Sequence, residues 1–262
     1  MLSNQSFIPL LLSLMAGLST VIGAFIVFFS KSQNKKLITF ALAFSAGVMI
    51  TVSFTDLFVS AEETLSKYNG KLNGVLLSIL FLLSGAFVAL LIDKFIPDEP
   101  KANPSEPSGK LYRVGFVSMI ALMIHNFPEG IATFVSGYEN TTLGISIALA
   151  IALHNIPEGI SVAMPIYYST QSKYQAFKYT LFSGLAEPVG ALLAFLFLRP
   201  YINEIILAII FAMVSGIMLY ISFAELIPAS RQYRYHKIYL FSIFLGICII
   251  PVSYTHLRAH ET

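Results

Sequence analysis

Eight apolar runs divide this chain, and they constrain its fold more than any other feature. Hydrophobic residues make up 56% of the sequence and charged residues only 11%, whereas soluble domains carry about 25% charged residues. A helix needs about 20 predominantly apolar residues to cross a bilayer, and barrel strands would appear instead as alternating segments of about ten residues. The runs predict an all-α polytopic membrane protein with eight transmembrane helices, at 7–29, 37–60, 72–92, 111–134, 143–165, 176–198, 204–226 and 238–254.

The distribution of lysine and arginine predicts how the chain is oriented. Twelve of the 16 Lys and Arg residues fall in one set of alternate loops and span ends, and such loops stay in the cytoplasm. Both termini are therefore expected outside, in a cell membrane such as the bacterial inner membrane. The segment 97–110 is rich in proline and charge, and we expect a flexible cytoplasmic loop there. With a net charge of +2 and no basic patch, a nucleic-acid partner is excluded.

We expect one transmembrane domain, at residues 1–251. The polar end at 252–262 interrupts the last apolar run and resembles translated adapter sequence, so we expect it to be non-native. Cys248 is the single cysteine, which excludes a disulfide or a multi-thiolate site within one chain. The sequence does not determine the oligomeric state, and a homodimer is one assembly that we consider.

Internal similarity predicts how the helices are related. The segment SAGVMITVSFTDL (45–57) aligns with VSGIMLYISFAEL (214–226), and AGLSTVIGA (16–24) aligns with SGLAEPVGA (183–191). The second helix thus pairs with the seventh and the first with the sixth, and the predicted orientation makes each pair antiparallel. This pattern indicates a 3+2+3 inverted repeat, a plan that recurs in secondary transporters with the substrate site at the repeat interface.

Two copies of one polar motif lie inside apolar runs: HNFPEG at 125–130 and HNIPEG at 154–159. Residues four apart share a helix face, so the His and Glu of each copy point the same way. Imidazole nitrogen and carboxylate oxygen together suit a first-row divalent metal, and the two asparagines add carbonyl oxygens. An ionisable residue costs about 2.5–3.5 kcal/mol at a helix centre, which favours metal or proton handling over packing. The candidate ligands are His125, Asn126, Glu129, His154, Asn155 and Glu158.

Four further residues are candidates from their place in the spans. Glu187 lies deep in the sixth span and is expected to join the site. Asp56 and Glu225 lie nearer span ends, so we expect them to line the pathway at opposite mouths, close to water and ionised without a partner. Core packing is the default for Met49, and a thioether contact with metal is the less favoured alternative.

These motifs, with GLAEPVGA and GIMLYISFAELIPA, resemble the ZIP (Zrt/Irt-like) family of divalent metal transporters, close to its bacterial zinc-uptake permease branch. The resemblance implies an eight-helix transporter that moves zinc into the cytoplasm, with iron, manganese and cadmium as further candidate substrates. It implies a site between the fourth and fifth helices, often binuclear, with metal as substrate and no cofactor. One ion would bind His125, Glu129, His154 and Glu158, with Met49 adjacent, and the other Asn126, Asn155, Glu158 and Glu187.

Two other functions use buried acids and bases. A proton-coupled carrier of another solute would need them, although not paired His-x-x-x-Glu half-sites. An intramembrane metalloenzyme would carry H-E-x-x-H, and no such run occurs in the sequence. We therefore expect a transporter rather than an enzyme. Because its ligands must be neutral histidine and ionised glutamate, metal and protons should compete for the site, and transport should weaken in acid.

Overall fold

The computed structural model describes residues 4–29, 34–95, 107–198 and 203–258, and this part of the chain is helical without any strand. The predicted all-α class is confirmed. The helices are α1 (Asn4–Phe28), α2 (Lys35–Val52), α3 (Phe58–Asn69), α4 (Lys71–Phe95), α5 (Pro107–Glu139), α6 (Thr141–Thr170), α7 (Lys173–Leu193), α8 (Glu204–Ile221), α9 (Ile227–Arg231) and α10 (His236–Arg258). Single π-helical turns follow α2, α7 and α8 at Ser53–Leu57, Ala194–Leu198 and Ser222–Leu226.

Seven helical stretches of the described chain are long and apolar enough to cross a membrane. Six of them are longer than the sequence indicated. In two of the six, a π turn joins two helices: α2 to α3 over Lys35–Asn69, and α8 to α9 over Glu204–Arg231. The predicted end of the second span at residue 60 was wrong. In α10 the apolar part is shorter, at His236–Ile249, so the eighth predicted span is the weakest.

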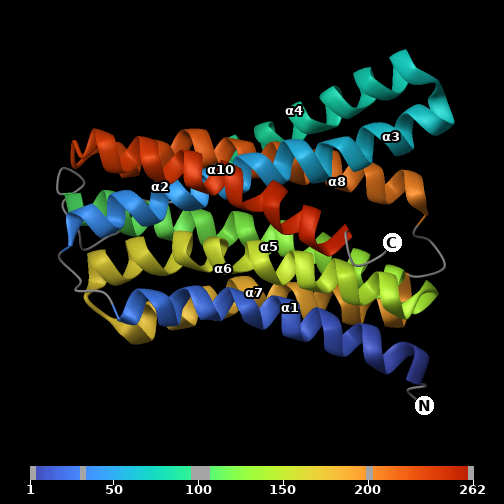
Figure 1. The fold of residues 1–262 in the computed structure, drawn as a ribbon, viewed down its shortest axis with the longest axis horizontal. Helices are drawn as coiled ribbons and strands as arrows, with labels where there is room; N and C mark the ends of the chain where they lie inside the picture. The colour runs from blue at the N-terminus through green and yellow to red at the C-terminus, as the bar shows by residue number, and fades with distance from the viewer. Residues whose placement is uncertain (1–3, 30–33, 96–106, 199–202, 259–262) are drawn as a thin grey trace.

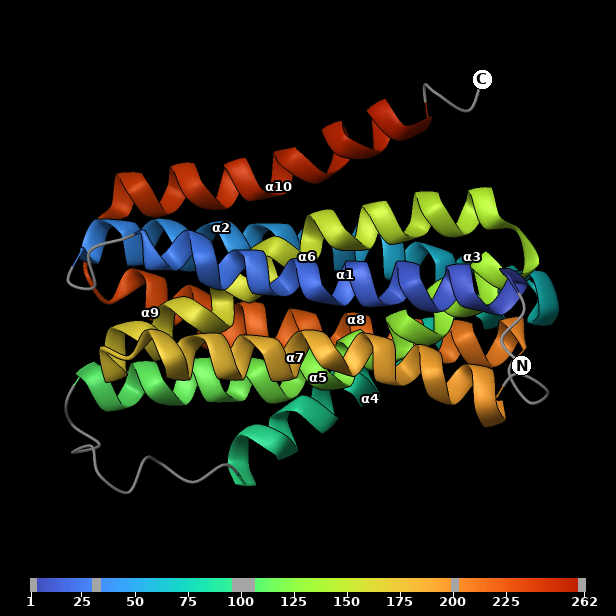
Figure 2. The same ribbon diagram turned by 90° about the horizontal axis from the view of Figure 1, so that it is seen from below.

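The ends of the chain and the predicted loop are only partly described. Pro107–Lys110 already belongs to α5, so the end of the predicted loop 97–110 was wrong, and residues 97–106 lie outside the described residues. The backbone of the predicted tail is helical as far as Arg258, and 259–262 lie outside the described residues. The start of α1 and the end of α10 lie at the same end of the bundle (Figures 1 and 2).

Helix packing places both polar motifs at the centre of the molecule. The helices α5 and α6 pack against each other, and α1 and α7 each pack against both of them. On the other side, α2 packs on α10 and α8 on α4, while α2 also contacts α6. Figure 2 shows the bundle from the side on which α1 crosses in front of α6.

Helices that the sequence pairs make matching contacts. A Cβ at Gly17 of α1 would overlap the carbonyl oxygen of Gly184 of α7, and a Cβ at Gly184 would overlap that of Gly17. The aligned segments of α2 and α8 both end in a π turn, which begins at Ser53 in one and at Ser222 in the other. Such matches fit the predicted pairing, and the inverted repeat as a whole stays a prediction.

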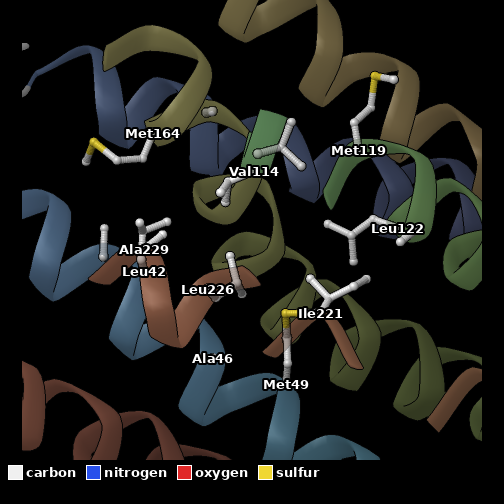
Figure 3. Close-up of a cluster of buried hydrophobic side chains, with 14 of the residues drawn as sticks. Leu42, Ala46, Met49, Val114, Met119, Leu122, Met164, Ile221, Leu226 and Ala229 are labelled. Carbon is white, nitrogen blue, oxygen red and sulfur yellow. The ribbon is translucent and has the colours of Figure 1, made fainter. Parts of the chain in front are cut away.

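The largest cluster of buried apolar side chains comes mainly from α2, α5, α6 and α8, with a few members from α1, α4, α7, α9 and two of the π turns. Figure 3 labels Leu42, Met49, Leu122 and Ile221 among its members. Leu122 lies one helical turn before His125, so this cluster forms an apolar wall beside the first motif. An apolar wall lowers the local dielectric constant, which strengthens electrostatic interactions nearby.

Candidate metal site

The two motifs bring four ionisable side chains together at the contact of α5 and α6. His125, Glu129, His154 and Glu158 are between 0% and 3% exposed, and we call them the central cluster. Both helices continue through the proline of their motif, so the i, i+4 spacing is kept and each His lies on the same face as its Glu. The two motifs face each other across the contact of α5 and α6, as the sequence predicted.

Distances within the central cluster are those of ligands around one small ion. His125 Nε2 lies 3.1 Å from Glu129 Oε1 and 3.2 Å from Glu158 Oε1, and His154 Nε2 lies 3.0 Å from Glu129 Oε1. Ligand atoms about 2.0–2.1 Å from a tetrahedral zinc ion are about 3.3 Å apart. One atom from each of His125, Glu129 and His154 fits within 4.8 Å of the others, so the cluster needs little movement to hold a metal.

Hydrogen bonding alone does not satisfy the central cluster. His154 Nε2 makes one hydrogen bond, to Glu129 Oε1, but six polar atoms of the cluster have no hydrogen-bond partner in the described chain: both ring nitrogens of His125, His154 Nδ1, Glu129 Oε2 and both oxygens of Glu158. A buried polar group without a partner costs about 1–3 kcal/mol, and a charged one costs more. A bound cation would offset this cost for the carboxylates, which packing does not do.

An oxygen-rich group lies beside the central cluster, and we call it the oxygen flank: Asn126, Asn155 and Glu187. Asn155 Nδ2 donates to Glu187 Oε2 at 2.9 Å and to the carbonyl of Ala16 at 3.0 Å. Asn126 Nδ2 donates to the carbonyl of Ser183 at 3.2 Å. With their nitrogens engaged, both amides keep their oxygens free, and Asn126 Oδ1, Asn155 Oδ1 and Glu187 Oε1 have no hydrogen-bond partner in the described chain.

Close helix contacts hold the oxygen flank in place. A Cβ at Gly130 would overlap the backbone carbonyl of Glu187, and one at Gly159 would overlap that of Thr20 on α1. Glycine in each motif thus lets a neighbouring helix approach its backbone. The side chain of Glu187 is fully buried, as its place deep in the sixth span predicted. Ser45 was missed: its hydroxyl donates to the carbonyl of Pro157 at 2.7 Å and fixes α2 against the second motif.

Met49 is fully buried in the apolar cluster of Figure 3. Its neighbours there include Leu122 and Ile221, so the default of core packing describes it. A thioether contact with metal stays a prediction. Asp56 lies within the π turn Ser53–Leu57 and is half-buried. Because the helix continues to Asn69, Asp56 lies farther from a helix end than predicted.

Glu225 has a charged partner in the structure, although the sequence predicted that it would be ionised without one. The carboxylate is only 8% exposed, and Glu225 Oε1 lies 3.6 Å from Nη1 of Arg113. Arg113 Nη2 also lies 2.8 Å from Asp93 Oδ1, and Tyr220 donates to Asp93 Oδ2 at 3.0 Å. We call Arg113, Asp93 and Glu225 the ion-pair group. The sequence did not predict this group, because Asp93 and Arg113 flank the predicted loop at 97–110, where charged residues are common at a membrane interface.

Comparison with known sequences assigns the chain to a family. The sequence profile described as "ZIP Zinc transporter" matches residues 97–253. The chain is also 44% identical over 261 residues to the protein named "Zinc transporter ZupT" from Streptococcus mutans, covering 96% of this chain and 98% of that protein. The chain belongs to the ZIP family.

Other relatives carry the same name. A zinc transporter ZupT from Oceanobacillus iheyensis is 44% identical over 262 residues, covering 95% of this chain and 98% of the relative. The zinc transporter ZupT of Chlorobaculum parvum is 43% identical over 263 residues, with 96% and 98% covered. The ZIP family consists of transporters, so the expectation of a transporter rather than an enzyme is confirmed by membership.

Proposed function

We propose that this chain transports zinc, or a similar divalent cation, into the cytoplasm through the central cluster. One observation carries the proposal: imidazole nitrogens and carboxylate oxygens of the buried central cluster lie 3.0–3.2 Å apart. Two imidazole nitrogens with carboxylate oxygens form a ligand set that zinc accepts. Relatives that match almost the whole chain are named zinc transporters.

A second ion is proposed for the oxygen flank. In this proposal Glu158 is shared by the two ions, because one of its oxygens faces His125 and neither oxygen has a hydrogen-bond partner in the described chain. The second ion would bind Glu158, Glu187, Asn126 and Asn155 through oxygen alone, and the first would bind nitrogen and oxygen. Harder cations prefer oxygen ligands, so the two ions need not have the same affinity for zinc.

The pathway is proposed to run from Asp56 on the outside to Glu225 at the cytoplasmic end. Support comes from the basic residues at the start of α2, α5, α7 and α10, since such ends stay in the cytoplasm. A cavity of about 350 Å³ adjoins Arg113 and Glu225 at that end. In this proposal both termini lie outside the cell membrane.

Orientation can be tested by thiol labelling in a Cys248→Ser background. Asn69→Cys and Tyr174→Cys place a thiol at exposed positions at opposite ends of the bundle. A membrane-impermeant thiol reagent should label Asn69→Cys in intact cells and Tyr174→Cys only in inverted vesicles. The reverse pattern would overturn the direction of the pathway. Light scattering of the purified protein would show whether it forms a homodimer.

Transport itself can be tested with purified protein in liposomes. Zinc should enter vesicles that contain the protein faster than vesicles without it. The same assay with iron(II), manganese and cadmium would rank the substrates. Because copper(II) binds most nitrogen and oxygen sites more tightly than zinc, discrimination against it would show that geometry selects the ion. If uptake of an organic solute depended on protons and no metal moved, the alternative of a proton-coupled carrier would replace this proposal.

A further inference from the structure

A groove lies between the first turns of α2 and α10, away from the central cluster. It has a volume of about 460 Å³, and its lining includes Lys36, Leu37, Phe40, Lys237, Ile238 and Phe241. Both lysines are exposed, and Phe241 is 64% exposed. Apolar side chains therefore form its walls, and two cationic side chains stand at its end.

The charge around this groove is of one sign. Segments 34–55 and 226–250 contain no aspartate or glutamate, although they carry Lys35, Lys36, Arg231, Arg234 and Lys237. The ammonium groups of Lys35 and Lys36 lie 5.8 and 5.9 Å from the ring centres of tyrosines on the α9–α10 side, Tyr233 and Tyr235. A ring face attracts an ammonium group without neutralising it, so the groove keeps a positive end.

Aromatic side chains continue the groove along the helices. The rings of Phe40 and Phe44 stack with their centres 5.8 Å apart and their planes at 4°, and Phe241 and Phe244 are exposed on α10. Hydrocarbon covers such side chains in a membrane protein. A ligand that suits the groove must have an anionic head and a long apolar tail.

We propose that this groove binds an anionic phospholipid. Its phosphate would lie between Lys36 and Lys237, and an acyl chain would lie along Phe40 and Phe241. Basic pockets between transmembrane helices bind anionic lipid head groups. The lipid would bridge α2 and α10, which matters because α10 packs mainly on α2. That contact depends on glycines: a Cβ at Gly47 would overlap the carbonyl oxygen of Ile243, and one at Gly246 that of Phe44.

The binding test uses the full chain in a neutral detergent. Dioleoylphosphatidylglycerol is titrated in, retention is measured by native mass spectrometry, and thermal unfolding is followed in parallel. The wild-type protein should retain this lipid and unfold at a higher temperature with it, and dioleoylphosphatidylcholine should do neither. The double variant Lys36→Gln, Lys237→Gln should bind phosphatidylglycerol about thirtyfold more weakly, the loss expected for two lysines at an anionic head group.

Matched controls separate this site from general attraction. Lys173→Gln with Lys178→Gln removes two charges from the same end of the bundle, on α7, and should leave lipid binding unchanged. Glycerol 3-phosphate and inorganic phosphate should not raise the unfolding temperature, because they lack the acyl chain. Equal binding of phosphatidylcholine, an equal loss in the α7 variant, or equal stabilisation by phosphate alone would each overturn the proposal.

Discussion

Two groups of acids, one buried and one partly buried, differ in the cation that faces them. In the central cluster, Glu129 and Glu158 face the imidazoles of His125 and His154. In the ion-pair group, Asp93 and Glu225 face the guanidinium of Arg113. Histidine can lose its proton and then donate a lone pair to a metal, whereas arginine stays charged and never accepts. The central cluster can therefore exchange a proton for a metal ion, whereas the ion-pair group keeps Arg113 as a fixed counter-ion.

The largest expected effect comes from removing charge at the central cluster. Glu158→Gln keeps the shape of the side chain but loses the charge that offsets dehydration of the ion. If that charge contributes even ~1.4 kcal/mol, zinc uptake in liposomes should fall about tenfold or more. The matched control is Glu63→Gln, an exposed carboxylate on α3, which should transport normally. Normal uptake by a folded Glu158→Gln protein would remove this residue from the site.

The second-largest effect is expected from low pH, which should weaken zinc binding at the central cluster. Lowering the pH protonates histidine, which then repels a cation, so zinc binding should weaken about tenfold between roughly pH 7.5 and 5.5. The cation of the ion-pair group does not change over this range, because arginine stays charged. Isothermal titration with zinc over this range measures the loss of affinity. Zinc affinity that did not change with pH would contradict histidine ligation.

A smaller effect is expected at the oxygen flank. Glu187→Gln removes one carboxylate beside the central cluster and leaves its two histidines in place. Zinc uptake should fall about threefold, which corresponds to roughly 0.65 kcal/mol, and the stoichiometry of tightly bound zinc should drop from two ions to one. A stoichiometry that stays the same in wild type and variant would argue against a second ion there.

The smallest expected effect on zinc comes from the ion-pair group. Arg113→Gln leaves Asp93 and Glu225 without their cation, and breaking a partly buried pair should lower the unfolding temperature by about 3 °C or more. Zinc affinity of the central cluster should stay within about twofold. The double variant Arg113→Gln, Glu225→Gln should recover part of the lost stability, as a double-mutant cycle would show. No recovery would mean that Arg113 and Glu225 are not coupled.

The sequence predicted the central cluster because its signal is local. The i, i+4 spacing in two copies, together with antiparallel neighbouring helices, is enough to bring His125, Glu129, His154 and Glu158 to one place. The all-α class and the family followed from run length and motif. Whether these residues bind metal stays a prediction, since the geometry establishes only that they converge.

Other features depend on contacts that no local pattern shows. Asp93 and Arg113 are separated by the loop, so the pairing of Arg113 with Asp93 and with Glu225 needs the packing of α4, α5 and α8. The second helix continues past its apolar run because residues such as Glu62, Glu63 and Lys67 favour helix while ending the hydrophobic signal. The hydrogen bond from Ser45 to Pro157 joins two distant parts of the sequence. Serine inside a span predicts no partner by itself.

The most direct test of the histidine-facing cluster as the metal site is the zinc-edge X-ray absorption spectrum of the purified protein loaded with one equivalent of zinc. The account predicts imidazole and carboxylate ligation, with two histidines and oxygen at about 2.0–2.1 Å. Replacing both His125 and His154 by alanine should remove the imidazole signal. An all-oxygen spectrum in the wild-type protein, or an unchanged one in the double variant, would contradict the assignment of the tight site to the central cluster.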